Sequence, residues 1–312
     1  MIWRRHAWSN RLQSLLLLAT LLGISALAGS LLLGSDGMWM ALVACLIALL
    51  VQPAAGARLT LALYQARPLP VHRARELWQL ADRLAARAGL PVAPLLYLAP
   101  SPLVNAFAVG QRRQSAIALS DGLLRSLSLR EIAGVMAHEI AHIANGDLRV
   151  MNLADYVSRL TALFAAVGQI LLLLLLPLVV AGSVDINLLA LLLLAVSPHL
   201  ALLAQLGLSR VREFHADLEA ARLTGDPAGL ASALAKIEGV SRSWRSWFLP
   251  GWGNPEPSWL RTHPATGERV ARLLSLARES IDESAVYEDA AHWPGEARAR
   301  RKPRWYPGGY WY

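Results

Sequence analysis

Residues 160–184 read LTALFAAVGQILLLLLLPLVVAGSV, a stretch without a single Asp, Glu, Lys or Arg. Leucines fill every position from 171 to 176, so a helix formed here would have no polar face. About 20 apolar residues suffice for a helix to span the hydrocarbon core of a bilayer, and buried helices of soluble proteins are usually shorter. The stretch therefore predicts a transmembrane helix, and with it a membrane protein.

Three further windows lack the same charged residue types, at positions 12–35, 37–57 and 186–209. Each is long enough to cross a bilayer, so the sequence predicts four transmembrane helices arranged in two hairpins. The last window contains Pro198 and His199, and a re-entrant or tilted helix is the alternative there. We expect His199 to be hydrogen-bonded within the bundle rather than to bind a metal.

The beginning of the chain allows a second interpretation. Basic residues and a leucine run precede Ala26-Leu27-Ala28, which resembles the cleavage site of a secretory signal. A second apolar window follows almost at once, and this favours a membrane hairpin.

Composition and charge agree with a membrane location. The chain is 55% hydrophobic and 17% charged, which excludes an ordinary soluble enzyme and a disordered chain. Its net charge is +8, and only Asp36 and Asp185 lie in the two short connections between windows. Because basic residues collect on the cytoplasmic side, we expect a multi-pass protein of the (inner) cell membrane with both termini in the cytoplasm. Cys45 is the single cysteine, so an internal disulfide is excluded.

The windows divide the chain into five expected parts. The two transmembrane hairpins are expected at residues 1–57 and 160–209. The two parts of a cytoplasmic domain are expected at 58–159 and 210–292, and a basic aromatic tail at 293–312. The two polar parts are expected to join into one domain. The tail is interpreted as mobile, or as suited to a membrane surface, and no nucleic acid is expected as a partner.

The first polar part combines helix and strand patterns. Residues 74–88 have the apolar spacing of an amphipathic helix, and 95–98, 104–109 and 115–119 resemble short strands. Gly110-Gln111-Arg112-Arg113 would link the last two strands as a hairpin loop does. The sequence predicts a mainly helical membrane protein whose soluble domain contains a small antiparallel sheet.

A capped helix follows the strands. Ser128 with Glu131 matches a capping box, and Asn145-Gly146 is a typical helix end. Between them lies His138-Glu139-Ile140-Ala141-His142. Residues four apart share a helix face, so both imidazoles can reach one ion, and Glu139 can serve as the base that accepts a proton from water. The alternative is an ordinary helix with two unrelated histidines; a separate apolar face disfavours it, made of Ile132, Val135, Met136, Ile140 and Ile143.

A catalytic zinc ion needs a third protein ligand and an open position. Glu213, just beyond the fourth window, is our candidate, and Asp217 lies one helical turn further on. The Asp217 carboxylate could accept a hydrogen bond from a ligating histidine. The alternative for both is a solvated helix face with Arg210 and Arg212 as partners. We expect one Zn²⁺ per chain, although manganese, cobalt or iron would suit the same ligands.

With these motifs the chain resembles the HtpX-type membrane metalloproteases, relatives of the CAAX prenyl proteases. The resemblance covers residues from about 10 to 275, and its matching features are Asn105-Ala106-Phe107-Ala108, His138-Glu139-Ile140-Ala141-His142, the stretch from Ser209 to Asp217, and Thr262-His263-Pro264 with Glu268-Arg269. It implies a zincin-like α+β domain and a cytoplasm-facing zinc endopeptidase that removes damaged or misassembled membrane proteins. Its substrates would be proteins or peptides. The family pattern does not account for the basic tail or for Trp244, Trp247, Trp252 and Trp259.

Further residues receive expected roles. The strand through Asn105 would pair with an extended substrate, and the Asn105 side chain would hold a substrate main-chain group or simply occupy a turn. The resemblance implies that His263 stabilises the oxyanion; the alternative is a residue that precedes a proline at the start of a helix. Arg269 is expected to anchor structure, and His215 to be solvated.

Three other functions remain alternatives. An intramembrane metalloprotease would carry the motif inside a membrane helix, but Arg130, Glu131, Asp147 and Arg149 bracket it here. A prenyl-peptide protease would have more membrane helices than the four windows. A non-catalytic zinc-dependent adaptor would need a fourth protein ligand, for which His263 or His215 could serve. The sequence assigns no oligomeric state.

Overall fold

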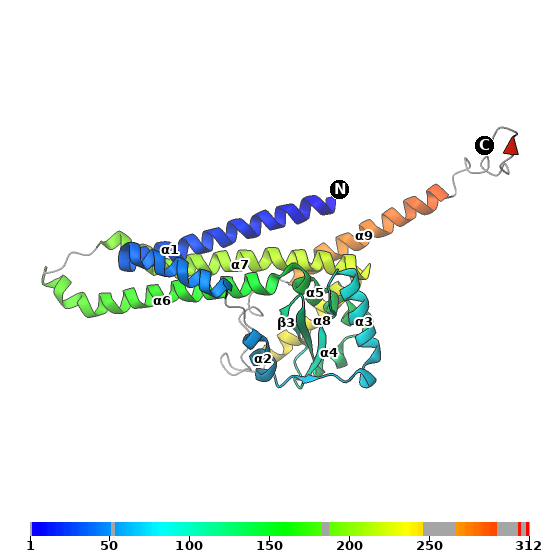
Figure 1. Cartoon of the computed structure of the whole chain (residues 1–312), viewed down its shortest axis with the longest axis horizontal. Coiled ribbons are helices and arrows are strands. Elements are labelled where there is room, and N and C mark those ends of the chain that lie inside the picture. Colours follow the sequence, from blue (N-terminus) through cyan, green and yellow to red (C-terminus); the bar gives the residue numbers. More distant parts are fainter. Residues whose placement is uncertain are drawn as a thin grey trace.

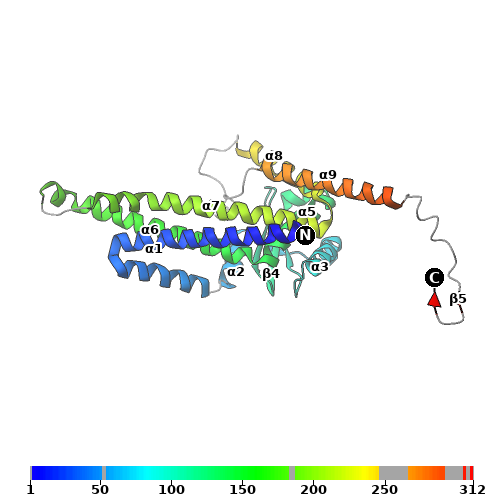
Figure 2. The ribbon, with the colours of Figure 1, turned by 90° about the horizontal axis from the view of Figure 1, so that it is seen from above.

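The computed structural model describes residues 2–50, 54–182, 187–245, 266–291, 305–306 and 310–311. Three long helices lie side by side and extend away from a smaller unit of helices and strands (Figures 1 and 2). They are α1 (Ile2–Leu50), α6 (Asp147–Val180) and α7 (Leu188–Thr224). The molecule is therefore an elongated helical bundle with a mixed α and β unit at one end.

The long helices contain three candidate membrane spans, Leu12–Ala48, Asp147–Leu178 and Leu189–Thr224. The sequence predicts four crossings, and the difference lies in α1, which contains the first charge-free window and most of the second. Gly34 in α1 has a non-helical backbone (φ 66°, ψ −147°), and the chain doubles back there (Figure 2). A Cβ atom at Gly29 would lie 2.4 Å from the carbonyl oxygen of Gly37, so the two arms meet where only glycine fits.

The outer surface of the bundle is apolar. Leucines such as Leu173 and Leu203 are 70% and 65% exposed, whereas small residues such as Ala28, Ala154 and Ala201 are buried between the helices. A water-soluble protein rarely exposes such a contiguous apolar surface, and a lipid environment explains it. Pro198 lies within the continuous helix α7. His199 is exposed on α7, and its expected hydrogen bond within the bundle stays a prediction.

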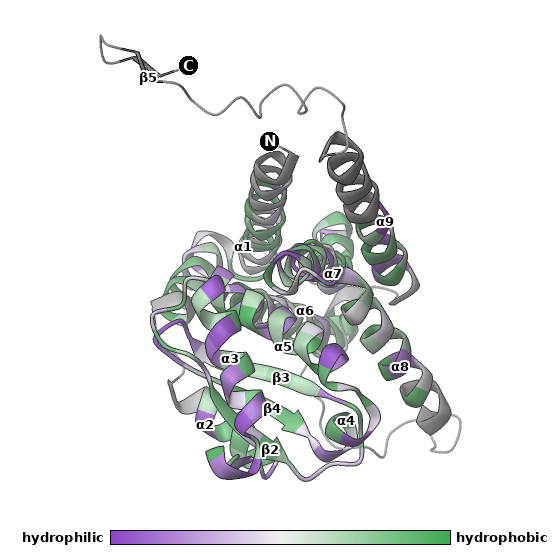
Figure 3. Cartoon of the chain, turned by 90° about the vertical axis from the view of Figure 1, so that its right-hand side faces the viewer, coloured by the Kyte–Doolittle hydropathy of each residue, from purple (hydrophilic) through white to green (hydrophobic). Residues whose placement is uncertain are grey.

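The smaller unit contains a sheet and shorter helices. Its elements are α2 (Ala54–Leu63), β1 (Arg67–Pro68), η1 (Val71–Arg73), α3 (Arg75–Arg87), β2 (Leu95–Ala99), β3 (Ala106–Gln111), β4 (Gln114–Ser120), α4 (Asp121–Ser126), α5 (Leu129–Asn145), α8 (Pro227–Arg245) and α9 (Thr266–Ala291). Figure 3 shows hydrophilic segments gathered on this unit. The two polar parts of the sequence contact each other, since α5 packs against both α7 and α8.

The sheet is mixed, and the prediction of an antiparallel sheet was wrong in one pairing. The strand order is β1-β2-β4-β3, and β2 and β4 are parallel whereas the other pairs are antiparallel. After β2 the chain passes the neighbouring position and forms β3 at the edge of the sheet. Strand β4 then returns between β2 and β3, and so runs parallel to β2. The hairpin itself matches the prediction, with Gln111 opposite Gln114.

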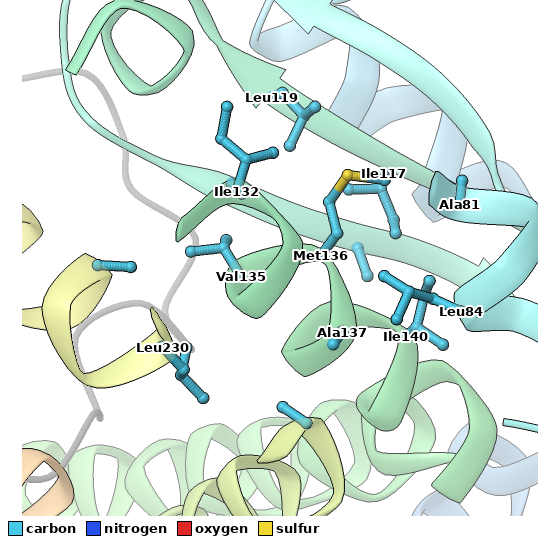
Figure 4. Packing of buried hydrophobic residues seen from close by; sticks show 14 of the residues in the cluster. Ala81, Leu84, Ile117, Leu119, Ile132, Val135, Met136, Ala137, Ile140 and Leu230 are labelled. Atoms are coloured by element: carbon cyan, nitrogen blue, oxygen red, sulfur yellow. The ribbon is translucent and has the colours of Figure 1, made fainter. Parts of the chain in front are cut away.

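The sheet separates two hydrophobic clusters. Ile117 and Leu119 of β4 face α5, where Met136 and Ile140 are fully buried (Figure 4). Alternate residues such as Phe107 face α2 on the opposite side. This alternation is the two-residue period of a strand, and it fixes α5 firmly against one face of the sheet.

The C-terminal tail is described only at Trp305–Tyr306 (β5) and Tyr310–Trp311 (β6), which pair as an antiparallel hairpin. The rest of the tail, with its predicted mobility or membrane contact, lies outside the described residues, as do Trp247, Trp252 and Trp259.

Candidate metal centre

Helix α5 begins and ends where the sequence predicts. The Ser128 side chain accepts a hydrogen bond from the Glu131 backbone N–H, and the Glu131 carboxylate accepts one from the Ser128 backbone N–H (2.8 Å). Gly146 ends the helix in the left-handed conformation (φ 71°). Helix α8 strengthens the first turn, because Lys236 Nζ and Ser232 Oγ donate to Glu131 at 2.8 and 2.6 Å. Burial alone would raise the pKa of Glu131, but these hydrogen bonds lower it to about 2.

One turn of α5 and one turn of α7 bring three metal-binding side chains together. Ligand atoms of His138, His142 and Glu213 all lie within 4.8 Å of one another, and the residues are only 6%, 9% and 5% exposed. The two imidazole Nε2 atoms are 3.1 Å apart. The Glu213 carboxylate oxygens lie 3.4 Å from Nε2 of His138 and 3.5 Å from Nε2 of His142.

These separations fit a metal ion. In a tetrahedral site with metal–ligand distances of about 2.0–2.2 Å, neighbouring ligand atoms are about 3.3–3.6 Å apart. The observed separations of 3.1–3.5 Å are close to that range. His138, His142 and Glu213 thus offer a donor set that zinc accepts, without large movements of the chain.

Each histidine has a carboxylate behind it. Nδ1 of His138 lies 3.0 Å from Oδ1 of Asp217, and Nδ1 of His142 lies 2.8 Å from Oδ2 of Asp147. These contacts turn both Nε2 atoms toward Glu213, which is the arrangement that orients histidine ligands in metal sites. Burial alone would lower the pKa of His142, but the carboxylates of Asp147 and Glu213 raise it well above its ordinary value.

Asp147 was missed by the sequence analysis, which considered it only as a charge flanking the motif. It directly follows the helix-ending Gly146, so no helical spacing connects it to His142. The available signal was an acidic residue immediately after the C-terminal cap of the motif helix. Such a residue lies near the last turn, where it can reach a histidine in that turn.

Two arginines neutralise part of the negative charge of the buried carboxylates. Arg269 of α9 is itself buried, donates to both oxygens of Asp217 (2.6 and 2.7 Å) and lies 2.9 Å from Oε2 of Glu213. Arg212 lies 2.7 Å from Oδ1 of Asp147. Burial alone would lower the pKa of Arg269, but Glu213 and Asp217 raise it, so Arg269 stays charged. Arg269 contacts the cluster directly, beyond its expected role as a structural anchor.

The formal charges of this cluster do not balance. With the imidazoles of His138 and His142 neutral, as metal binding requires, four negative charges stand against the two positive charges of the arginines among the described residues. The negative charges are those of the buried carboxylates Glu139, Asp147, Glu213 and Asp217. Uncompensated buried charge is costly, and the surplus of two negative charges equals the charge of one divalent cation. Charge and geometry therefore both fit a metal such as zinc.

Glu139 lines a cavity of about 390 Å³ together with His142 and Glu213. The cavity lies between α2, β3, α6 and α7, and β3 contributes Ala108 and Val109 to its wall. A carboxylate beside the metal ligands in an accessible space can exchange a proton with water held there. The cavity thus reaches the cluster at His142 and Glu213.

The remaining predicted residues are placed differently. Asn105 precedes edge strand β3; its backbone N–H donates to Ser120 Oγ and its carbonyl accepts from the Ser120 N–H, both at 3.0 Å. The structure does not bring Asn105 into the described cavity wall. His215 is half-buried and accepts a hydrogen bond from the Asn145 amide (3.1 Å), so its expected solvation is only partial. His263 lies outside the described residues.

The protein combines an apolar helical bundle with two histidines and a buried glutamate that could bind one metal ion. This combination is typical of membrane-bound metalloproteases. The model of peptidase family M48 matches residues 71–277. The chain belongs to this family. The match extends from η1 to the first half of α9 and includes His138, His142 and Glu213.

Proteins called "Protease HtpX homolog" are similar over most of their length. The one from Pelotomaculum thermopropionicum is 35% identical over 281 residues, covering 85% of this chain and 94% of that protein. The one from Acaryochloris marina is 37% identical over 287 residues, covering 85% and 92%. The crystal structure of S. mikatae Ste24p aligns with a TM-score of 0.47 and 20% identity, covering 86% of this chain and 66% of that one.

Proposed function

We propose that the chain is a membrane-anchored, zinc-dependent endopeptidase that cleaves misfolded or damaged membrane proteins on the cytoplasmic side. The observation that carries the proposal is the buried cluster of His138, His142 and Glu213 beside Glu139, open to a cavity. The similarity to proteins named as HtpX protease homologues supports the protease activity.

In this proposal His138, His142 and Glu213 hold the zinc ion, which supplies Lewis acidity at the scissile carbonyl and lowers the pKa of water. Glu139 accepts the proton of the attacking water and passes it to the leaving amine. Asp217 fixes the imidazole of His138 so that its Nε2 faces the ion, a role that the 3.0 Å contact supports.

Substrate contacts are assigned to two further residues. Asn105 would bind a main-chain group of the substrate at the start of β3, and His263 would stabilise the oxyanion. The position of β3 at the sheet edge supports an extended substrate, because an edge strand offers backbone groups to a peptide.

We further propose that the two arms of α1 cross the membrane separately, so that the chain crosses four times with both termini cytoplasmic. The reversal at Gly34 supports two arms. The five expected parts of the chain, 1–57, 58–159, 160–209, 210–292 and 293–312, follow from these crossings.

Two alternatives are disfavoured by particular observations. An intramembrane protease would have its motif in a membrane helix, but α5 packs between the sheet and α8 and lies outside the candidate spans. A structural zinc site would be closed by a fourth protein ligand, whereas the described metal-binding group has three members and His215 contacts Asn145 instead. A prenyl-peptide substrate stays as an outcome of the experiment.

The experiment compares the wild type with Glu139→Gln after purification in detergent with a chelator. Zinc is then added, and hydrolysis of an unfolded casein-like substrate and of a prenylated peptide is followed. We expect both proteins to bind about one zinc and only the wild type to cleave, since the amide cannot accept the proton. Equal casein hydrolysis by both proteins would contradict the role of Glu139.

A matched control uses Glu219→Gln, because Glu219 lies on α7 and pairs with Arg222 away from the cluster. It should cleave like the wild type. Cleavage of the prenylated peptide but not of casein would replace the proposed substrate class, and zinc binding without any cleavage would favour the adaptor.

A further inference from the structure

The cavity beside Glu139 continues beyond the metal cluster. One of its walls follows α6 from Asp147 through Met151 and Tyr156 to Arg159. Asp147 and Arg159 are twelve positions apart in one helix, so this wall extends about 18 Å along the helix axis at about 1.5 Å per residue. We call this extension the α6 passage.

The far end of the α6 passage lies where α6 becomes apolar. Arg159 is the last charged residue before the charge-free stretch 160–184, and its exposed side chain lies 2.9 Å from Asp155. Basic residues next to an apolar helix are typical of the lipid–water interface. The passage therefore connects the start of the charge-free stretch of α6 with the metal cluster.

The walls of the passage suit an extended chain. Other parts of the wall are formed by Ala57 and Thr60 of α2 and by Ala108 and Val109 of β3. These side chains are small, and in the described sheet β3 pairs with β4 alone, so its other backbone edge is turned away from the sheet. A peptide lying along β3 can form main-chain hydrogen bonds with that edge.

We propose that the α6 passage binds the juxtamembrane segment of a membrane-protein substrate, between its membrane span and the bond that is cleaved. This inference rests on the proposed endopeptidase function. An extended chain advances about 3.3 Å per residue, so a length of about 18 Å requires about five residues. The chain then cleaves an embedded substrate no closer than about five residues from the end of its span, whereas a free peptide has no such limit.

The test uses the full-length protein and zinc in liposomes. Model substrates carry one membrane span, an unstructured linker of about two to twelve residues and a common sequence that is also supplied as a free peptide. Mass spectrometry maps the cleaved bond. We expect linkers shorter than about five residues to be cleaved at least about tenfold more slowly than longer ones.

The outcomes separate this inference from the proposed function. Equal cleavage at every linker length, with cleavage of the free peptide, would overturn the passage and leave the endopeptidase intact. Absence of cleavage of every substrate, the free peptide included, would overturn the proposed function on which the passage rests.

A pair of variants tests the position of the passage. Asn152 is exposed on α6 and lines the cavity halfway along it, whereas Arg149 is exposed on the same helix outside the described lining. Asn152→Trp should lower the ratio of the cleavage rate of the tethered substrate to that of the free peptide about tenfold, because a bulky ring narrows the α6 passage. Arg149→Trp should keep the wild-type ratio. Equal ratios in both variants would place the substrate elsewhere.

Discussion

Asp147 Oδ2 lies 2.8 Å from Nδ1 of His142, although Asp147 belongs to the membrane-directed helix α6 and His142 to α5. The other oxygen of Asp147 is held by Arg212 of α7. One buried carboxylate thus joins three helices at the metal cluster. Its position depends on the packing of two long bundle helices against the smaller unit.

Asp147→Asn should weaken zinc binding. The amide keeps the size of the carboxylate but loses the charge that favours the oriented imidazole of His142, and loss of such partners costs about 10–100-fold in metal affinity. Competition with a chromophoric chelator measures the affinity. Asp155→Asn is the control, because Asp155 lies on the same helix and pairs with Arg159 at the surface. Unchanged affinity in Asp147→Asn would contradict the orienting role.

Arg269→Met should destabilise the metal-free protein. It leaves the buried carboxylates of Glu213 and Asp217 without their shared cation, and breaking a buried ion pair costs about 3–5 kcal/mol. Thermal unfolding in detergent measures the loss, and zinc should restore part of it because the ion supplies positive charge. Arg272→Met is the control, since Arg272 is on the same helix and exposed. Similar losses in both variants would argue against a special role of Arg269.

Glu131 predicts a specific response to acid. Its pKa falls from an ordinary 4.5 to about 2 in the folded protein, so its contribution to stability is complete above about pH 4.5 and disappears as the pH falls toward about 2. Glu131→Gln should therefore be less stable than the wild type near pH 6, by about 1–2 kcal/mol. The difference should shrink between pH 4.5 and 2, as followed by denaturant unfolding. A difference independent of pH over that range would refute the ionic contribution.

Gly134→Ala should destabilise α5, although alanine is the better helix former. A Cβ atom at Gly134 would lie 2.9 Å from Cα of Leu230, so α8 would have to move. Gly239→Ala is the matched control, because a Cβ atom there meets nothing within 4 Å. Helix propensity favours that change by about 1 kcal/mol. We expect Gly134→Ala to lower the free energy of unfolding and Gly239→Ala to raise it. Changes of the same sign in both variants would contradict the close contact of α5 and α8.

Local sequence signals located much of the candidate site. The capping box at Ser128 and the glycine at position 146 defined α5, and helical spacing placed His138 and His142 on one face. The structure brings Glu213 to them and Asp217 to the side of His138, as the spacing in α7 suggested. These features depend on residues within one or two helical turns. Over that range the spacing of residues in the sequence predicts their relative positions.

Relations between distant segments were less accessible. Short strands have the same residue pattern in parallel and antiparallel pairs, so the parallel pairing of β2 and β4 left no trace in the sequence. The contacts of Asp147 with Arg212 and of Asp217 with Arg269 join different helices. Charge-free windows marked the apolar segments, but only the backbone at Gly34 reveals that two of them share one kinked helix.

Helix α7 is unbroken from Leu188 to Thr224, so the exposed leucines of the bundle and Glu213 belong to one rigid rod. From Leu188 to Glu213 the rod is about 38 Å long, and a change in tilt of about 5° would shift its end by about 3 Å. His138 and His142 instead sit on a helix anchored to the sheet. Because Glu213 moves with α7, the geometry of the metal cluster depends on how α7 packs in the bundle. We therefore expect zinc affinity to differ between bilayers of different thickness.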